Sequence, residues 1–374
     1  MRSMGIERRR LLSALALGGL CAGLGPRASA QGRPRDGALY LAARKNGGHY
    51  EMALFDGRAR DRLAVALPGR GHSFAIDGER RRCVVFGRQP GYFAMAVDLY
   101  REREPLVLDV APGRHFYGHG VYAPDGRRLY ATENDYEAGR GVVGVYDCAA
   151  GGGYRRLGEY PTGGVGPHEA VLLPDGRTLC VANGGILTHP DYGKLQLNAD
   201  TMRPSLAYLD LATGELAEQV FLDDALNRLS IRHLVVDGAG HVWFACQYTG
   251  PGTRQPPLLG RHRRGRAAEL YAAPGDTQRA MRNYIGSLAY DPHSGLVAAT
   301  SPVGGVTVFW DAAGGRCVGA CAVFDGCGVA AAPGGGFLIS SGDGRLARAA
   351  PDNGFALADP VTRGVAWDNH LRRV

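Results

Sequence analysis

Residues 120–147 read GVYAPDGRRLYATENDYEAGRGVVGVYD, and this stretch decides the fold. It contains an apolar strand, a turn at Asp125 and Gly126, a second apolar strand, a polar loop and a third strand that ends at Asp147. Short β-rich segments separated by Asp-Gly turns are typical of antiparallel strands. The stretch therefore predicts one small antiparallel sheet and no helix.

Copies of this unit recur along the chain and predict a repeat fold. Counted by their first apolar strand, the copies begin at Ser73, Gly120, Ala170, Leu234, Ser287 and Gly328. Each copy fits one blade of a β-propeller, in which small sheets are arranged around a central channel. The copies predict six blades.

A seventh blade is split across the two ends of the chain. Residues 364–368 have the pattern of an innermost strand without later partners, and residues 38–43, 52–56 and 63–67 have the pattern of outer strands without an earlier one. Pairing these ends closes the ring and removes its exposed sheet edges. We therefore predict an all-β fold, a seven-bladed β-propeller with four-stranded blades, whose last blade is closed by the N- and C-terminal strands.

The first thirty residues have the features of a twin-arginine signal peptide. Three arginines at residues 8–10 precede a short apolar segment at residues 11–24, and small residues at 28–30 offer a cleavage site. We expect residues 1–30 to be removed and residues 31–374 to form the propeller. The expected location is the periplasm.

Composition limits the classes of partner. The chain has 43 Lys and Arg against 36 Asp and Glu, a formal net charge of +7, and part of this excess lies in the signal peptide. So small an excess does not favour nucleic-acid binding. No later segment is long and apolar enough for a membrane helix. We expect no nucleic-acid partner and no membrane span. A lipid on Cys21 is a disfavoured alternative, because Leu20 stands where lipidation sites need a small residue.

Several short segments of the sequence resemble those of a known family. They are Leu41-Ala42-Ala43-Arg44, Arg70-Gly71-His72, Tyr117-Gly118-His119-Gly120, Tyr130 to Asp135, Gly166-Pro167-His168-Glu169, Ala182 to Pro190, Met202 to Leu206 and Trp367-Asp368-Asn369-His370. On these phrases the chain resembles uncharacterised, twin-arginine-exported seven-bladed propellers, described as a domain of unknown function, that are encoded beside imelysin-type and di-haem proteins in bacterial iron-uptake clusters. The resemblance implies the fold, the periplasm and periplasmic iron-uptake proteins of the imelysin type as partners. It implies no reaction.

Four histidines, His72, His119, His168 and His233, stand just before the predicted innermost strand of four consecutive blades. Innermost strands of a propeller run in the same direction, so we expect these side chains at one mouth of the channel. Converging neutral imidazoles suit a transition metal such as copper, iron or zinc. Glu133 and Glu169 can add carboxylates to this ligand set. The alternative is that each histidine caps a strand or bonds a neighbouring backbone group.

Other polar residues are expected at the same mouth as cofactor-binding groups. They follow the second strands of their blades and are Arg44, Arg88, Glu133, Asn134, Asn183 and Gln247. Asp343 is expected at the same mouth. Ordinary turn chemistry is the alternative for them. His370 follows its strand and is expected in a turn at the opposite end, outside the histidine group. The long insertion at residues 186–204 is expected to overhang the histidines as a binding loop or lid, or else to be a variable surface loop.

Three functions remain compatible with these features. The first is a periplasmic metal-handling or partner-binding accessory in the acquisition of iron or another transition metal. The second is a metal-dependent redox or hydrolytic enzyme with its site at the same channel mouth. The third is a purely structural interaction propeller. No local catalytic motif is present, which favours a protein that is not an enzyme, although propeller sites assembled from distant loops need no such motif.

Overall fold

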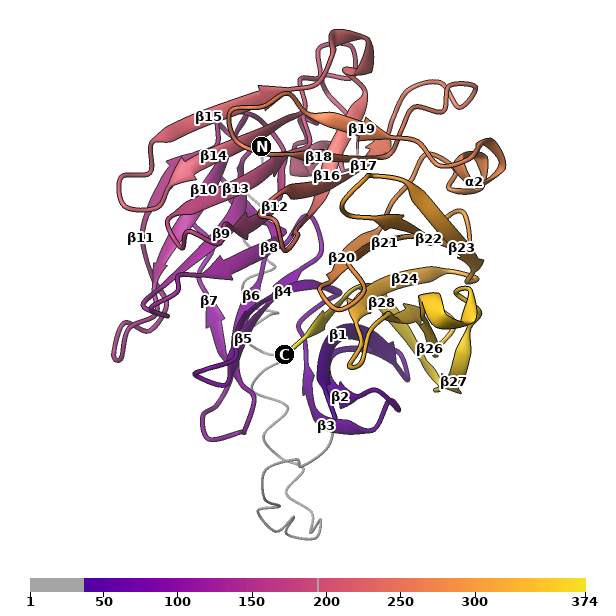
Figure 1. The fold of residues 1–374 in the computed structure, drawn as a ribbon. Helices are drawn as coiled ribbons and strands as arrows, with labels where there is room; N and C mark the ends of the chain where they lie inside the picture. The colour runs from indigo at the N-terminus through magenta and orange to yellow at the C-terminus, as the bar shows by residue number, and fades with distance from the viewer. Residues whose placement is uncertain (1–36, 194) are drawn as a thin grey trace, which may run out of the picture. The chain divides into compact units, whose positions relative to one another are not determined.

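The computed structural model describes residues 37–193 and 195–374 (Figure 1). The predicted signal peptide, residues 1–30, lies outside these described residues. Residues 38–374 form one compact unit made of seven four-stranded antiparallel sheets. The predicted all-β, seven-bladed propeller is confirmed.

In six blades the strands follow chain order from the innermost to the outermost. The first two blades contain β4 (Gly71–Asp77), β5 (Arg82–Gly87), β6 (Ala94–Asp98) and β7 (Leu106–Leu108), then β8 (Arg114–Tyr122), β9 (Arg128–Asp135), β10 (Arg140–Asp147) and β11 (Arg155–Pro161). The third and fourth contain β12 (Pro167–Leu172), β13 (Thr178–Asn183), β14 (Ser205–Asp210) and β15 (Leu216–Phe221), then β16 (Leu229–Val236), β17 (Val242–Tyr248), β18 (Leu259–His262) and β19 (Glu269–Tyr271). The fifth and sixth contain β20 (Ser287–Asp291), β21 (Leu296–Ser301), β22 (Val306–Asp311) and β23 (Cys317–Ala322), then β24 (Gly326–Ala331), β25 (Phe337–Ser341), β26 (Arg345–Ala349) and β27 (Ala358–Thr362).

The seventh blade joins the two ends of the chain. Its innermost strand is β28 (Val365–Arg373), which pairs with β1 (Leu39–Asn46), followed by β2 (His49–Asp56) and β3 (Asp61–Ala66). In Figure 1 the yellow C-terminal strand lies beside the indigo N-terminal strands. The predicted closure is therefore confirmed, but the closing strand continues past Asp368 to Arg373.

Buried apolar side chains fill each interface between adjacent blades. Leu41 and Leu54 of the seventh blade pack with Phe74 and Val85 of the first, for example. Equivalent clusters lie between all other neighbouring pairs around the ring. This continuous packing fixes the innermost strands around the channel. Helices are short, α2 (Gly275–Ala280) among them, and no helix of the described residues is long and apolar enough to cross a membrane.

Candidate metal centre

β-Bulges in the innermost strands turn histidine side chains toward one place. The pairing of β4 with β5 shifts register between Gly71 and Phe74, where His72 lies, and β8 shifts between Phe116 and Gly120, where His119 lies. The same irregularity occurs at His168 in β12. A bulge adds residues to one strand and re-aims the side chains there. The repeated bulge explains how separate blades direct histidines at a common point.

The histidines lie within the innermost strands rather than before them. His72, His119, His168 and His233 belong to β4, β8, β12 and β16 and are 5%, 2%, 8% and 1% exposed. The structure thus brings the four side chains together and buries them, while their place at one end of the channel stays a prediction. The bulges cause the difference, because the extra residues lengthen each innermost strand around its histidine.

His370 joins this group, contrary to the sequence-based expectation of a turn at the opposite end. Opposite Ala42 and Arg44, β28 carries a bulge that includes His370, which is only 1% exposed. His370 adopts a φ of 73°, a left-handed conformation that costs a non-glycine residue energy. Gly328 of β24 permits this path, because a Cβ atom there would lie 3.0 Å from the carbonyl carbon of His370.

The five rings form one cluster with His119 at its centre. The centroid of the His119 ring lies 4.9 Å from that of His72, 4.8 Å from His168, 6.0 Å from His233 and 4.7 Å from His370. Two groups of three ring nitrogens each have all atoms within 4.8 Å of one another, and His119 belongs to both. In a tetrahedral zinc site with Zn–N distances of about 2.0–2.1 Å, two ligand nitrogens lie about 3.3–3.4 Å apart. The nitrogens of either group must therefore approach one another by up to about 1.4 Å to bind one such ion.

The ring nitrogens are the feature that fits a metal best. Six buried ring nitrogens have no hydrogen-bond partner among the described residues: Nδ1 of His72 and His168, Nε2 of His119 and His370, and both nitrogens of His233. Buried polar atoms in folded proteins are nearly always paired. Strand caps would have hydrogen-bonded partners, so these atoms fit the ligand interpretation better than the capping one.

Glu169 lies beside the rings as the sequence predicts. Its Oε1 is 3.6 Å from Nδ1 of His119 and its Oε2 is 3.4 Å from Nδ1 of His233, although neither contact has hydrogen-bond geometry. Arg372 of β28 pairs with the same carboxylate. Glu169 also accepts a hydrogen bond from the backbone N–H of Leu234 at 3.2 Å. One carboxylate therefore connects three innermost strands.

Burial keeps the rings neutral, and neighbouring groups keep the carboxylate charged. Burial lowers the pKa of His233 to about 4, and it lowers the pKa of His72, His168 and His370 well below the usual value. Burial alone would raise the pKa of Glu169, yet the charge of Arg372 and the neighbouring His119 bring it well below its usual range. Neutral imidazoles and an ionised carboxylate are the protonation states that bind metal.

Gly118 tests how closely the cluster depends on backbone geometry. It has a φ of 102°, and a Cβ atom there would lie 2.4 Å from Cδ2 of His72. We expect Gly118→Ala to lower the free energy of unfolding by about 2 kcal/mol, because an alanine is strained at this φ and displaces the ring. Urea unfolding measures this, with Gly158→Ala as control because no atom lies within 4 Å of that site. Equal stability of the two variants would contradict the expectation.

The predicted cofactor-binding residues mostly hold strands and loops together. Arg44 pairs with Glu51 and Asp61, and Glu133 accepts hydrogen bonds from Tyr146 and Arg156. The side-chain amide of Asn134 donates a hydrogen bond to the backbone carbonyl of Thr188, that of Asn183 to the carbonyl of Thr162, and that of Gln247 to the carbonyl of Ile285. Asp343 accepts a hydrogen bond from Arg345. Arg88 pairs with Asp368 at 2.9 Å, and its charge lowers the pKa of His72 further than burial does alone. A cofactor-binding role for these residues stays a prediction.

The insertion between β13 and β14 is attached at its base to the first two blades. The Thr188 hydroxyl lies 3.3 Å from the Tyr117 hydroxyl and accepts a hydrogen bond from Gln89 at 3.1 Å. Asn134 donates to the Thr188 carbonyl at 3.2 Å. Because Tyr117 is close in sequence to His119 on β8, the insertion contacts the strand that carries the central ring. Whether it acts as a lid stays a prediction.

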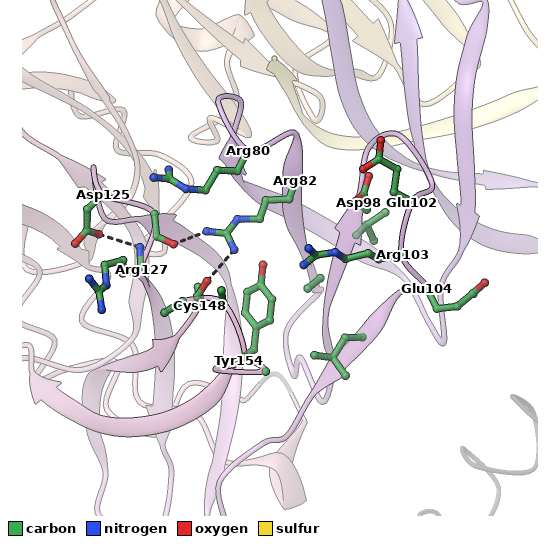
Figure 2. A pocket seen from close by; sticks show the side chains of 18 residues that line it. Arg80, Arg82, Asp98, Glu102, Arg103, Glu104, Asp125, Arg127, Cys148 and Tyr154 are labelled. Carbon is green, nitrogen blue, oxygen red and sulfur yellow. Dashed lines mark hydrogen bonds between the residues drawn. The ribbon is translucent and has the colours of Figure 1, made fainter. Parts of the chain in front are cut away.

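A separate pocket of about 940 Å³ lies at the rim between the first and second blades (Figure 2). Charges of both signs line it, namely Arg80, Arg82, Arg103 and Arg127 and also Asp98, Glu102, Glu104 and Asp125. Arg82 donates to the Cys148 carbonyl at 2.9 Å and pairs with Asp77, so its guanidinium is already used within the protein. The pocket shows none of the converging ligand atoms found in the channel.

Comparisons with known proteins agree with this architecture. Residues 65–374 match the model of a family described as "Protein of unknown function (DUF1513)". The chain belongs to this family. A search of curated proteins finds no match. The family assignment is consistent with the resemblance seen in the sequence, while the proximity of imelysin-type and di-haem genes stays an expectation.

Solved structures share the fold at low sequence identity. A chain of Kuenenia stuttgartiensis hydrazine synthase matches with a TM-score of 0.59 and 15% identity over 84% of this chain and 90% of that one. The periplasmic gluconolactonase PpgL of Pseudomonas aeruginosa matches with a TM-score of 0.61 and 15% identity over 91% and 99%. The β-propeller domain of Cps50 (Swd1) from Myceliophteria thermophila gives 0.55 and 11% over 87% and 96%. At these identities the likeness shows the fold alone.

Proposed function

We propose that this protein binds a transition metal ion in its channel and acts as a metal-handling accessory in the acquisition of iron or another transition metal. The observation that carries the proposal is the set of buried, unpartnered ring nitrogens from five blades, which converge around His119. A structural role for buried histidines would leave these nitrogens hydrogen-bonded. A bound metal ion gives these buried ring nitrogens a partner.

The donor set indicates the class of metal. Imidazole nitrogens suit zinc, copper and iron, whereas calcium and magnesium prefer sites made wholly of oxygen ligands. His72, His119 and His168 form one candidate group, and His119, His233 and His370 form the other. Glu169 supplies a negative charge beside both groups through its contact with His119. Because the rings are buried, exchange of the ion with solvent requires movement of a side chain or of the insertion.

The location and partners belong to the same proposal. The predicted twin-arginine signal supports action in the periplasm, and the family resemblance supports periplasmic iron-uptake proteins of the imelysin type as partners. N-terminal sequencing of the exported protein should begin near Gln31. A retained arginine run at residues 8–10 would contradict export by this route.

Metal analysis of the exported protein tests the central claim. The full chain is expressed with its own leader, released from the periplasm without chelators, and analysed for copper, iron and zinc by mass spectrometry. We expect close to one ion per chain, or two if both histidine groups are filled. Protein that holds no stoichiometric metal and binds none on titration contradicts the proposal and leaves the purely structural interaction propeller.

A metal-dependent redox or hydrolytic enzyme at the same centre is the second candidate. It is supported by one residue, Arg232, whose partly exposed side chain lies next to His233 in the chain and has no carboxylate partner among the described residues. Hydrazine synthase and a gluconolactonase, by their names, are enzymes with this fold. Turnover of a substrate that depends on the bound metal would favour this function over the accessory role.

A further inference from the structure

Arg232 occupies the bulge of β16 and stands apart from the other charged residues of the channel. It is the extra residue between Ile231, which pairs with Cys246, and His233, which pairs with Ala245. Its Nε is buried without a hydrogen-bond partner, and the side chain as a whole is partly exposed. The bulge that aims His233 at the cluster thus also contains Arg232.

The neighbouring arginines are all paired with carboxylates. Arg372 pairs with Glu169, and Arg88 pairs with Asp368. Arg228, just before β16, pairs with Asp200. Arg232 forms no such ion pair within residues 37–193 and 195–374, so its charge has no partner in the described protein.

The surroundings of Arg232 make this charge costly. Burial lowers its pKa, and the side chains that act on it most after burial are Tyr117, Tyr284 and Cys246, none of which is a carboxylate. A guanidinium remains charged in proteins nonetheless. Only Nε is fully buried and the rest of the side chain is partly exposed, but a partly buried charge without a counter-ion is still unfavourable. A metal cation in the adjacent cluster would increase the excess of positive charge.

The position of Arg232 relates it to the rings as well as to the insertion. Its charge contributes, after burial and the neighbouring histidines, to the lowered pKa of His168, and likewise affects His233. Tyr117, whose hydroxyl contacts Thr188 of the insertion, also acts on the pKa of Arg232. Arg232 therefore lies near both the candidate metal centre and the residue of β8 that the insertion contacts.

We infer that Arg232 binds a small planar oxyanion, a carboxylate or carbonate, that takes an open coordination position of the metal in the histidine cluster. The inference rests on the proposed function, because the cluster must hold the metal. The planar fork of a guanidinium donates two parallel hydrogen bonds to such an anion. The anion offsets the charge of Arg232 and of the metal together, which neither the neutral rings nor the already paired Glu169 can do.

The test uses cobalt(II) as the probe metal and acetate and bicarbonate as probe anions. The full mature chain is loaded with cobalt, whose visible spectrum reports its coordination, and each anion is titrated in turn. We expect either anion to change the spectrum and Arg232→Gln to weaken its binding at least tenfold. Arg232→Lys should restore part of the affinity, because it keeps the charge but not the fork. The two anions distinguish an organic carboxylate from carbonate as the natural ligand.

Arg228→Gln is the matched control, because Arg228 is an arginine close in sequence whose ion pair lies outside the cluster. It should leave the affinity for the anion unchanged. An unchanged spectrum with both anions, or equal affinity in Arg232→Gln and wild type, would overturn the inference while leaving the metal site intact. If cobalt does not bind, the proposed function fails. Calorimetry of the metal-free protein then measures whether Arg232 alone binds these anions. If neither anion binds, the inference fails together with the proposed function.

Discussion

Replacing His119 by alanine should lower the affinity for metal more than replacing any other ring in the channel. His119 is the one residue shared by the two groups of candidate ligands, and its ring lies within 4.7 to 6.0 Å of the other four by centroid distance. Loss of a residue that merely orients a ligand typically costs about 10–100-fold in metal affinity. We therefore expect at least about 100-fold for His119→Ala, measured by competition with a chromophoric chelator.

Folding of the variant must be separated from loss of the ligand. His119 Nε2 has no hydrogen-bond partner in the described protein, so substitution removes no protein hydrogen bond at that atom. His119→Gln keeps much of the volume and should preserve the thermal midpoint of the metal-free protein while losing metal. His241→Ala is the control, because that ring lies outside the cluster, 3.0 Å from Asp237. Wild-type metal affinity in both His119 variants would exclude the site.

The blades could be predicted because the turns between their strands contain recognisable residue pairs. Asp-Gly and Pro-Gly turns separate short apolar strands, and each strand keeps one buried face. The pairing of the two chain ends also followed from the pattern, since β1 lacked an inner partner and β28 lacked outer ones. Four of the five clustered rings could be identified because they recur once per blade. The burial of these rings could not be predicted, because the bulges that re-aim them do not change the composition of the strands.

His370 was missed because its bulge imitates a turn. Asp368, Asn369 and His370 follow Trp367, and Asp and Asn are common turn residues. In the structure these three residues face a single residue of β1, Ala43, and the strand resumes at Leu371, which is 1% exposed. A buried apolar residue directly after the apparent turn was the signal that the strand continued.

The polar residues after the second strands were assigned by position alone, and local pairing decided their orientation. Arg44 is 5% exposed because two carboxylates on neighbouring strands hold it within the seventh blade. Glu133 points into its own blade, where Tyr146 donates to it at 2.6 Å. Arg232 differs from these residues, because it has no carboxylate partner among the described residues. The sequence places it beside His233 without indicating that it lacks a carboxylate partner, since ion pairs depend on chain segments far apart.

The metal-free protein should lose stability steeply as the pH falls below about 6.5, the ordinary pKa of histidine. In the folded state burial lowers the pKa of His233 to about 4 and lowers the pKa of His72, His168 and His370 well below the usual value. The unfolded chain then binds more protons than the folded one, so acid favours unfolding. Stability is fully present above pH 6.5 and declines toward the lower folded pKa values. Each ring held neutral costs about 1.4 kcal/mol per pH unit in this window.

The arginines that face the rings act in the same direction as burial. Arg372, Arg88 and Arg232 disfavour protonation of the neighbouring rings, and only Glu169 favours it. Urea unfolding of chelator-treated protein at several pH values from 8 to 5 measures the effect.

His370→Asn should reduce the slope of the free energy of unfolding against pH by about one proton. Zinc at one hundred times its dissociation constant should raise the free energy of unfolding at pH 7.5 by about 2.7 kcal/mol. Because metal binding competes with protons, the zinc-bound protein should lose stability with acid more steeply still. A free energy of unfolding that stays constant from pH 7.5 to 5 would mean that the rings are already solvated, and the buried cluster would then not exist in solution.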